Sequence, residues 1–255
     1  MAVVFRDIAV CPPHTLLDRF EEKARQRYAK RAEALDMDIE DYLEELSNHV
    51  TKLVADTEIW MRRRPQTLWS ILRDGRFKSQ FETHRSGGTY DLPARRDTEE
   101  AFFGYPEKLA HERRPVYGYL TSEPFGRFGL TSEDEVGFYG KVAIRFKKWQ
   151  VARKVTFTLE DSLSEGSMKE GLSLVPVPLL APSYHALSLR RSYYTDYLHE
   201  WVTLHDVDPY AEIQLHEGLY IDDIAEVVFF DRYGVDADLE NELENRGIPY
   251  CFESY

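Results

Sequence analysis

The sequence predicts an α+β protein in which an N-terminal helical layer precedes a mainly antiparallel β core. Helical periodicity dominates the first 75 residues, whereas short strand-like segments between turn residues dominate the rest. The helices also come before the strands, instead of alternating with them as a doubly wound parallel sheet requires. We therefore expect an N-terminal helical subdomain over residues 1–75 and an α+β domain over residues 76–255.

Three helices are predicted in the N-terminal subdomain. Residues 14–35 are rich in helix formers, and apolar residues recur there at helical spacing. Residues 39–61 place apolar side chains on one face of a second helix. A third helix begins at Pro65 and ends at Gly75, which are the residues preferred at those two positions. The apolar faces of these helices need a partner to bury against.

The rest of the chain is predicted to be strands with a few helices between them. Residues 76–98 are polar and contain paired glycines, which indicates a short strand and a long loop. A helix or helix pair is predicted over 183–205, and a short helix over 236–247. Strands are predicted over residues 114–120, 138–146, 151–162, 208–218, 224–231 and 248–254.

Composition and charge exclude several classes of protein. The chain is 43% hydrophobic, which is enough for a sizeable core, and its formal net charge is -13. An acidic surface repels phosphates, which disfavours general nucleic-acid binding. The sequence contains no run of about 18 apolar residues, so no membrane span is predicted. The N-terminus has no signal-peptide pattern, so we expect a cytoplasmic protein or an effector that is delivered without a classical signal peptide.

Standard cofactor and metal motifs are missing from the sequence. It contains no P-loop, no glycine-rich dinucleotide fingerprint, no HExxH and no GxSxG. Its eight histidines are scattered, so no metal site is predicted. Cys11 and Cys251 lack zinc-type spacing and are expected to be free thiols, although a disulfide between them is an open alternative.

Three predicted strands carry polar residues, and in two of them these residues stand at alternate positions and therefore lie on one face of the strand. Solvent-facing positions of an ordinary antiparallel sheet give the same pattern, so each set alone favours that interpretation. Together, and in this order, they also suit a binding cleft. The sets are Arg114 with Tyr117, Thr156 with Thr158 and the following Ser162, and Glu212 with Gln214.

These strands also resemble a known family. The segments "RPVYGYL", "FYGKVAIRFKKWQVARKVTFTLEDSL" and "YAEIQLHEGLYIDDIAEVVF" resemble a bacterial family known only as a domain of unknown function. The resemblance covers roughly residues 75–230. More distantly, the order is similar to mono-ADP-ribosyltransferases, which carry an Arg or His on a first strand, Ser/Thr-x-Ser on a second and a catalytic Glu on a later one. This resemblance implies an ADP-ribosyltransferase-like fold with a split β-sheet and NAD as the substrate.

The resemblance also implies roles for individual residues. Glu212 would be the catalytic carboxylate. Gln214 lies on the same strand face by its spacing and would either orient an acceptor or be an ordinary solvent-facing strand residue. Arg114, or alternatively Arg85, would contact the pyrophosphate of NAD, because a guanidinium binds two phosphate oxygens at once. The remaining cleft residues would be Tyr117, which is also an alternative to Arg114 in the first motif, and the hydroxyls of Thr156, Thr158 and Ser162.

Three functions remain open at this point. The first is an NAD-dependent ADP-ribosyltransferase, a glycosyltransferase acting on a protein or nucleic-acid acceptor, or an NAD glycohydrolase; as a toxin or effector it would have a cognate inhibitor. Tyr210 stands where arginine-modifying members carry Glu or Gln, which leaves the acceptor open. The second is a catalytically degenerate domain of this fold that binds a protein. The third is an unrelated acidic phage or bacterial accessory protein.

Overall fold

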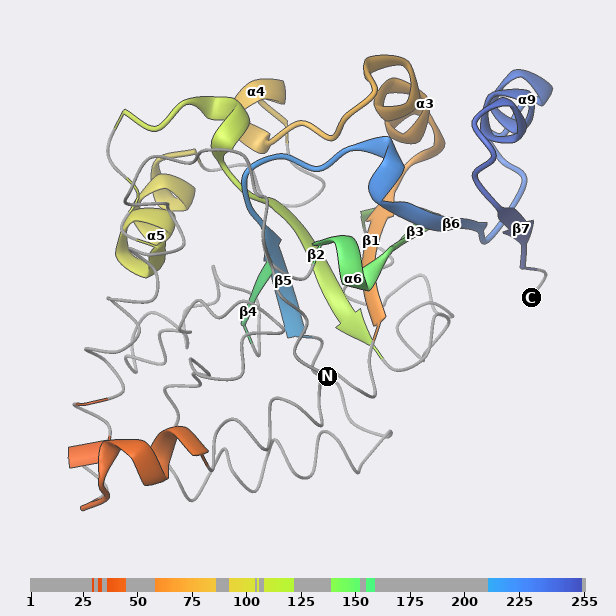
Figure 1. Ribbon diagram of the computed structural model, residues 1–255. Helices are drawn as coiled ribbons and strands as arrows, with labels where there is room; N and C mark the ends of the chain where they lie inside the picture. Colours follow the sequence, from red (N-terminus) through yellow and green to blue (C-terminus); the bar gives the residue numbers. More distant parts are fainter. Residues whose placement is uncertain are drawn as a thin grey trace.

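The core of the protein is a seven-stranded sheet. The computed structural model describes residues 29, 32–33, 36–44, 58–85, 92–103, 105, 108–121, 139–151, 155–158 and 211–253. Within these residues the strands are ordered β4-β5-β2-β1-β3-β6-β7 (Figure 1). Their bounds are β1 Glu58–Arg63, β2 Val116–Thr121, β3 Val142–Phe146, β4 Val155–Thr158, β5 Ala211–Leu215, β6 Ile224–Phe229 and β7 Tyr250–Phe252. All pairs are antiparallel except β6–β7, which is parallel. The prediction of an α+β class with a mainly antiparallel sheet is confirmed.

Several helices pack beside this sheet. The labelled helices are α3 Pro65–Asp74, α4 Gln80–Thr83, α5 Leu92–Phe103, α6 Lys148–Val151 and α9 Ala237–Asn245, with 3-10 turns at His111–Arg113 (η1) and Ile221–Asp223 (η5). Residues 39–44 are also helical. In Figure 1, α5 and α9 lie at opposite ends of the sheet, α5 beyond β2 and β5 and α9 beside β7. Within the described part of the chain, no helix combines the length and apolar character of a membrane span.

The predicted second helix over 39–61 is wrong at its C-terminal end. Residues Glu58–Arg63 form β1, which pairs with β2 on one side and β3 on the other. Ile59, Trp60 and Met61 are all fully buried, because a central strand is covered on both faces. A short apolar run of this kind fits a buried helix as well as a buried strand, which explains the error. Residues before the predicted boundary at residue 75 therefore take part in the sheet.

The loop predicted over residues 76–98 is also wrong, because this segment contains α4 and the start of α5. A capping box starts α4: the hydroxyl of Ser79 accepts from the amide of Glu82, and the carboxylate of Glu82 accepts from the amide of Ser79. The Ser-x-x-Glu spacing was visible in the sequence as a helix start. The paired glycines, which suggested a loop, lie outside the described residues.

Most other predicted elements are confirmed where the structure describes them. Helix α3 begins at Pro65 and ends at Gly75, which has the left-handed φ of 75° that favours glycine. Strands β3, β5, β6 and β7 and helix α9 fall within their predicted ranges, and β2 extends one residue beyond its range, to Thr121. The strand predicted over 151–162 is β4, with α6 ending at Val151. The helix predicted over 183–205 lies outside the described residues.

The two faces of the sheet differ in composition. One face belongs to a large apolar cluster in which strand residues pack with Leu68, Ile71 and Leu72 of α3 and Leu239 and Leu243 of α9. The other face carries a small aromatic and aliphatic cluster around Trp60 and Tyr119. Because successive strand residues point to opposite faces, Glu212, Gln214 and Tyr117 lie on the second face together with Tyr119.

Candidate functional site

The strand register brings the three predicted polar sets onto neighbouring strands. β5 lies between β2 and β4 and pairs antiparallel with both. One row of paired residues runs Tyr119–Glu212–Thr158, and the next row runs Tyr117–Gln214–Thr156. The Cβ atoms of residues paired across neighbouring strands lie roughly 4.5–5.5 Å apart. The sets that are distant in sequence therefore meet at one end of the sheet.

Glu212 is held by its neighbour on the same strand face. The amide of Gln214 donates to Oε1 of Glu212 at 2.9 Å. Glu212 is 5% exposed and Gln214 is fully buried. The carboxylate also acts on Tyr117: burial is the main cause that raises the pKa of Tyr117, and the charges of Glu99 and Glu212 raise it further. Glu212 and Tyr117 thus share one electrostatic environment.

Arg114 is committed to a buried ion pair. Its Nη1 donates to Oε2 of Glu99 at 2.6 Å, and its guanidinium carbon lies 4.1 Å from the centroid of the Phe81 ring. The other oxygen of Glu99 accepts from the hydroxyl of Tyr117 at 2.7 Å. Arg114 is only 3% exposed, so its guanidinium is turned into the protein. This partner differs from the pyrophosphate that the sequence predicted for Arg114.

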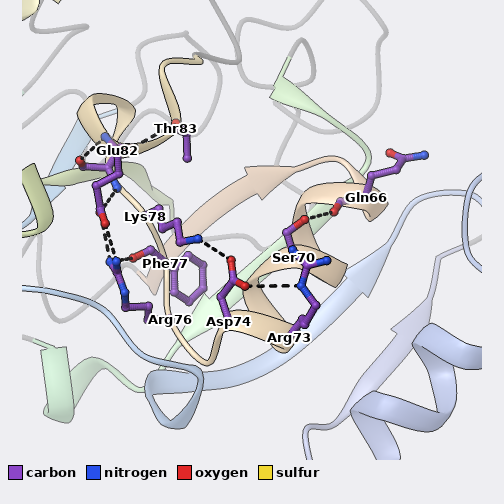
Figure 2. Close-up of polar contacts among 10 residues, drawn as sticks. Gln66, Ser70, Arg73, Asp74, Arg76, Phe77, Lys78, Glu82 and Thr83 are labelled. Carbon is purple, nitrogen blue, oxygen red and sulfur yellow. Dashed lines mark hydrogen bonds and ion pairs between the residues drawn. The ribbon is translucent and has the colours of Figure 1, made fainter.

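The α3–α4 connection holds Phe81 beneath Arg114. Figure 2 shows Arg76 bound to the carboxylate of Glu82, with Nη1 at 3.1 Å from Oε2, and Lys78 bound to Asp74 at 2.7 Å. Ser79 ties α4 to the turn before Arg114, because its hydroxyl donates to the carbonyl of His111 at 2.7 Å. The Ser79–His111 hydrogen bond fixes α4 against η1, and the Arg76–Glu82 pair links α4 to the segment that follows α3.

Two charged residues of this region were missed by the sequence reasoning. Glu99 lies on α5, just beyond the segment predicted as a loop, and its spacing of four residues from Arg95 was the available helical signal. Arg62 lies on β1, which was predicted as the end of a helix. Trp60 pairs with Tyr119, and Arg62, two residues further along, lies on the same sheet face as Glu212.

Arg62 is buried among aromatic side chains. It is 4% exposed, and its guanidinium carbon lies 3.9 Å from the centroid of the Phe230 ring. Burial raises the pKa of Tyr119 to about 12, and the charge of Arg62 and its hydrogen bond to Tyr119 oppose this rise. Arg62 and Glu212 therefore flank Tyr119 on β1 and β5.

His216 extends the polar side of β5 beyond Gln214. Its Nδ1 is bonded to the hydroxyl of Tyr105, and the Phe103 ring meets the imidazole edge-to-face with centroids 4.9 Å apart. Burial lowers the pKa of His216 to about 3, so the imidazole is neutral at physiological pH. No pattern in the sequence around His216 indicated that it would be a buried, neutral imidazole bound to Tyr105.

The remaining predicted site residues are less informative. Arg85 is exposed just after α4. Ser162 lies outside the described residues, and Thr156 and Thr158 are placed by register alone. Among the described residues, no group of three His, Cys, Asp or Glu side chains is arranged to hold a metal. Cys251 is an exposed free thiol.

Comparison with known proteins gives two relatives from mycobacteriophages. No family model matches the chain. It is 28% identical over 254 residues to the Gene 2 protein of Mycobacterium phage L5, covering 93% of this chain and 90% of that protein. It is 27% identical over 216 residues to the Gene 2 protein of Mycobacterium phage D29, covering 82% and 77% respectively.

A search of solved structures finds DarT from Thermus sp. 2.9 in complex with NAD+. That match has 12% sequence identity and a TM-score of 0.41, and it covers 76% of this chain and 94% of DarT.

Proposed function

We propose that the protein cleaves NAD at the nicotinamide–ribose bond, as an ADP-ribosyltransferase or an NAD glycohydrolase, with Glu212 as the catalytic carboxylate. The supporting observation is the register of three strands. It sets Glu212 and Gln214 between Tyr117 and Tyr119 on one side and Thr156 and Thr158 on the other. These are the residue sets whose resemblance to mono-ADP-ribosyltransferases predicted a common cleft.

The chemistry suits a carboxylate fixed on a strand. When nicotinamide leaves with the electron pair of its bond to ribose, the sugar becomes oxocarbenium-like and positively charged. A carboxylate in a site that excludes water stabilises that charge more strongly than it does in water. Gln214 would keep the Glu212 carboxylate in place through its 2.9 Å hydrogen bond. Water or a macromolecular acceptor then attacks the ribose carbon and releases a proton.

For the pyrophosphate we propose Arg62 in place of Arg114. Arg62 lies on β1, on the same face of the sheet as Glu212. Arg114 is already neutralised by Glu99, and taking it from that buried carboxylate is costly. Arg85 stays an alternative because its side chain is exposed.

The test is nicotinamide release from NAD by purified protein. Glu212→Gln removes the charge with little change of shape, and we expect release to fall by about 10²–10³-fold, the range for removing one preorganised electrostatic contact. Glu226→Gln is the matched control, because Glu226 is a carboxylate on the same sheet face, on β6, and pairs there with Arg145. Full turnover by folded Glu212→Gln protein would contradict the proposal.

A second candidate is a non-catalytic domain of the same fold that binds a protein. The observation that favours it is the burial of both charged groups of the site, Glu212 at 5% and Arg62 at 4% exposure. Calorimetry with NAD at millimolar concentration separates the two functions. Heat of binding together with nicotinamide release supports the enzyme. Absence of both, in a chain that binds a protein partner tightly, supports the second candidate.

One observation supports the third hypothesis, an unrelated acidic accessory protein. The two sequence relatives are mycobacteriophage proteins, which agrees with a phage setting but carries no statement of activity. A wide separation of Arg114, Thr156 and Glu212 would favour it. Thr156 and Glu212 lie on paired strands, whereas the guanidinium of Arg114 is bound to Glu99. The proposed reaction has a protein or a nucleic acid as its acceptor, and a toxin or effector of this kind would also have a cognate inhibitor.

A further inference from the structure

A buried carboxylate outside β5 connects α5 to the candidate site. Glu99 is fully buried, and its two oxygens bind different residues. Oε2 accepts from Arg114 at 2.6 Å and Oε1 accepts from the hydroxyl of Tyr117 at 2.7 Å. One carboxylate thus joins α5 both to the segment that enters β2 and to β2 itself.

Tyr117 is held by α5 at two points. Besides the bond from its hydroxyl to Glu99, the guanidinium carbon of Arg95 lies 4.1 Å from its ring centroid. Arg95 and Glu99 stand four residues apart, so both lie on one face of α5. Tyr117 has few orientations left with both its ring and its hydroxyl occupied.

The orientation of Tyr117 matters because of its neighbour across the strands. Tyr117 pairs with Gln214, and the amide of Gln214 donates to Glu212. A directly paired side chain is the nearest neighbour on a sheet face. The ring of Tyr117 therefore limits where the amide of Gln214 can lie, and that amide limits the Glu212 carboxylate.

Stability alone is a poor explanation for this arrangement. Burial raises the pKa of Glu99 and is opposed by its bonds to Tyr117 and Arg114, which reflects the cost of keeping this acid in the interior. Well-packed apolar residues often replace a buried ion pair without loss of stability. A carboxylate differs from an apolar residue here in that it fixes the direction of the Tyr117 hydroxyl.

We propose that Glu99 is a positioning residue that acts on Glu212 through Tyr117 and Gln214. The inference rests on the proposed function, because it assigns Glu99 a part in the same reaction. Glu99 itself touches neither substrate nor the reacting atoms. Its effect should appear in the rate of the chemical step more than in the binding of NAD.

The kinetic test compares Glu99→Gln with Glu100→Gln, an exposed neighbour on α5. We expect kcat for nicotinamide release to fall by about 10–100-fold in Glu99→Gln, the range for loss of a supporting hydrogen bond behind a functional group. KM for NAD should change by less than about threefold, and Glu100→Gln should match the wild type. An unchanged kcat in folded Glu99→Gln protein overturns the inference.

A double variant tests the route through Tyr117. Tyr117→Phe removes only the hydroxyl and leaves the Glu99–Arg114 ion pair intact, so it also serves if Glu99→Gln fails to fold. We expect Tyr117→Phe alone to lower kcat, and adding Glu99→Gln to lower it little more, because coupled residues are non-additive. An unchanged kcat in Tyr117→Phe, or a full further loss in the double variant, overturns the route.

A spectroscopic measurement separates this inference from the proposed function. The side-chain amide resonance of Gln214, assigned with Gln214→Asn, is recorded by NMR without NAD. It should shift in Glu99→Gln and in Tyr117→Phe but stay in place in Glu100→Gln. If wild-type protein releases no nicotinamide, the proposed function fails, and this shift still decides whether Glu99 positions Gln214. A Gln214 resonance that does not move in either variant overturns the inference.

Discussion

The two faces of the sheet are made by the same strands, but burial is favourable for the side chains of one face and costly for the polar side chains of the other. On β5, Ile213 and Leu215 enter the large apolar cluster, whereas Glu212 and Gln214 face the other way. All four residues are at least 95% buried. Burying Ile213 and Leu215 is favourable in itself, because apolar surface leaves water. Burying Glu212 and Gln214 is unfavourable unless each polar atom finds a partner.

This difference teaches where stability and where chemistry should be sought. The apolar face tolerates substitution as long as volume is kept, and it provides the free energy of folding. Burying the polar groups costs free energy, and their partners are specific: Gln214 for Glu212 on β5, and Glu99 for Arg114 beside the sheet. A costly arrangement that the rest of the fold supports is typical of a functional site.

The largest expected effect on stability comes from breaking the buried ion pair between Arg114 and Glu99. Arg114→Met should lower the free energy of unfolding by about 3–5 kcal/mol, because it leaves the Glu99 carboxylate without its cation. Urea unfolding measures the loss. The double variant Arg114→Met with Glu99→Leu should recover most of it, because no uncompensated charge is left inside. A double variant as unstable as the single one would show that the cost lies in packing and not in charge.

Neighbouring positions on β5 give the next prediction. Ile213→Ala should lower the free energy of unfolding by about 2–5 kcal/mol, since Ile213 is fully buried in the apolar cluster. Glu212→Gln should change it by less than about 1 kcal/mol, because the shape is kept and one desolvated charge is removed. Urea unfolding of both variants, beside nicotinamide release, tests the contrast. Equal destabilisation by the two changes would abolish the distinction between the faces.

Gly118 tests how closely β1 and β2 approach. A Cβ at this position would lie 2.3 Å from the carbonyl oxygen of Trp60, so Gly118→Ala should cost about 1–3 kcal/mol by overpacking. The loss is measured from the shift in thermal unfolding. Gly75→Ala is the matched control: a Cβ there meets nothing within 4 Å, and only the left-handed backbone, φ 75°, should cost about 1 kcal/mol. A smaller loss at Gly118 than at Gly75 would contradict the close approach.

The last predicted effect is a dependence of stability on pH, on the order of 2 kcal/mol between pH 7 and pH 5. Burial lowers the pKa of His216 from 6.5 to about 3, so the unfolded chain binds a proton that the folded chain does not. The contribution is fully present above pH 6.5 and is lost as pH falls toward 3, at up to about 1.4 kcal/mol per pH unit. Urea unfolding at pH 7 and pH 5 measures it. His216→Asn should remove this part of the slope, whereas Tyr105→Phe, which keeps the imidazole, should retain it; equal slopes in all three proteins would argue against a buried neutral imidazole.

The sequence carried much of the strand content of this fold, because alternation and turn residues are local signals. Glu212, Gln214, Tyr117 and the threonines of β4 were found from such patterns. Their meeting depends on which strands pair, and pairing is decided by contacts far apart in the chain. Arg62 was not predicted as a site residue, because the apolar run before it fits a helix as well as a strand. Glu99 and Arg114 had no signal as a pair, because an ion pair between two elements leaves no local pattern.

The position of β5 in the sheet also sets an order of assembly during synthesis. β2 and β4 are made first, but within the described residues β4 pairs only with β5, and β5 fills the place between them. Until residues 211–215 emerge, the edge of β2 is open and the carboxylate of the candidate site does not yet exist. The proposed NAD cleavage therefore requires β5 to be in place, and an open strand edge in that interval is a place where nascent chains can aggregate.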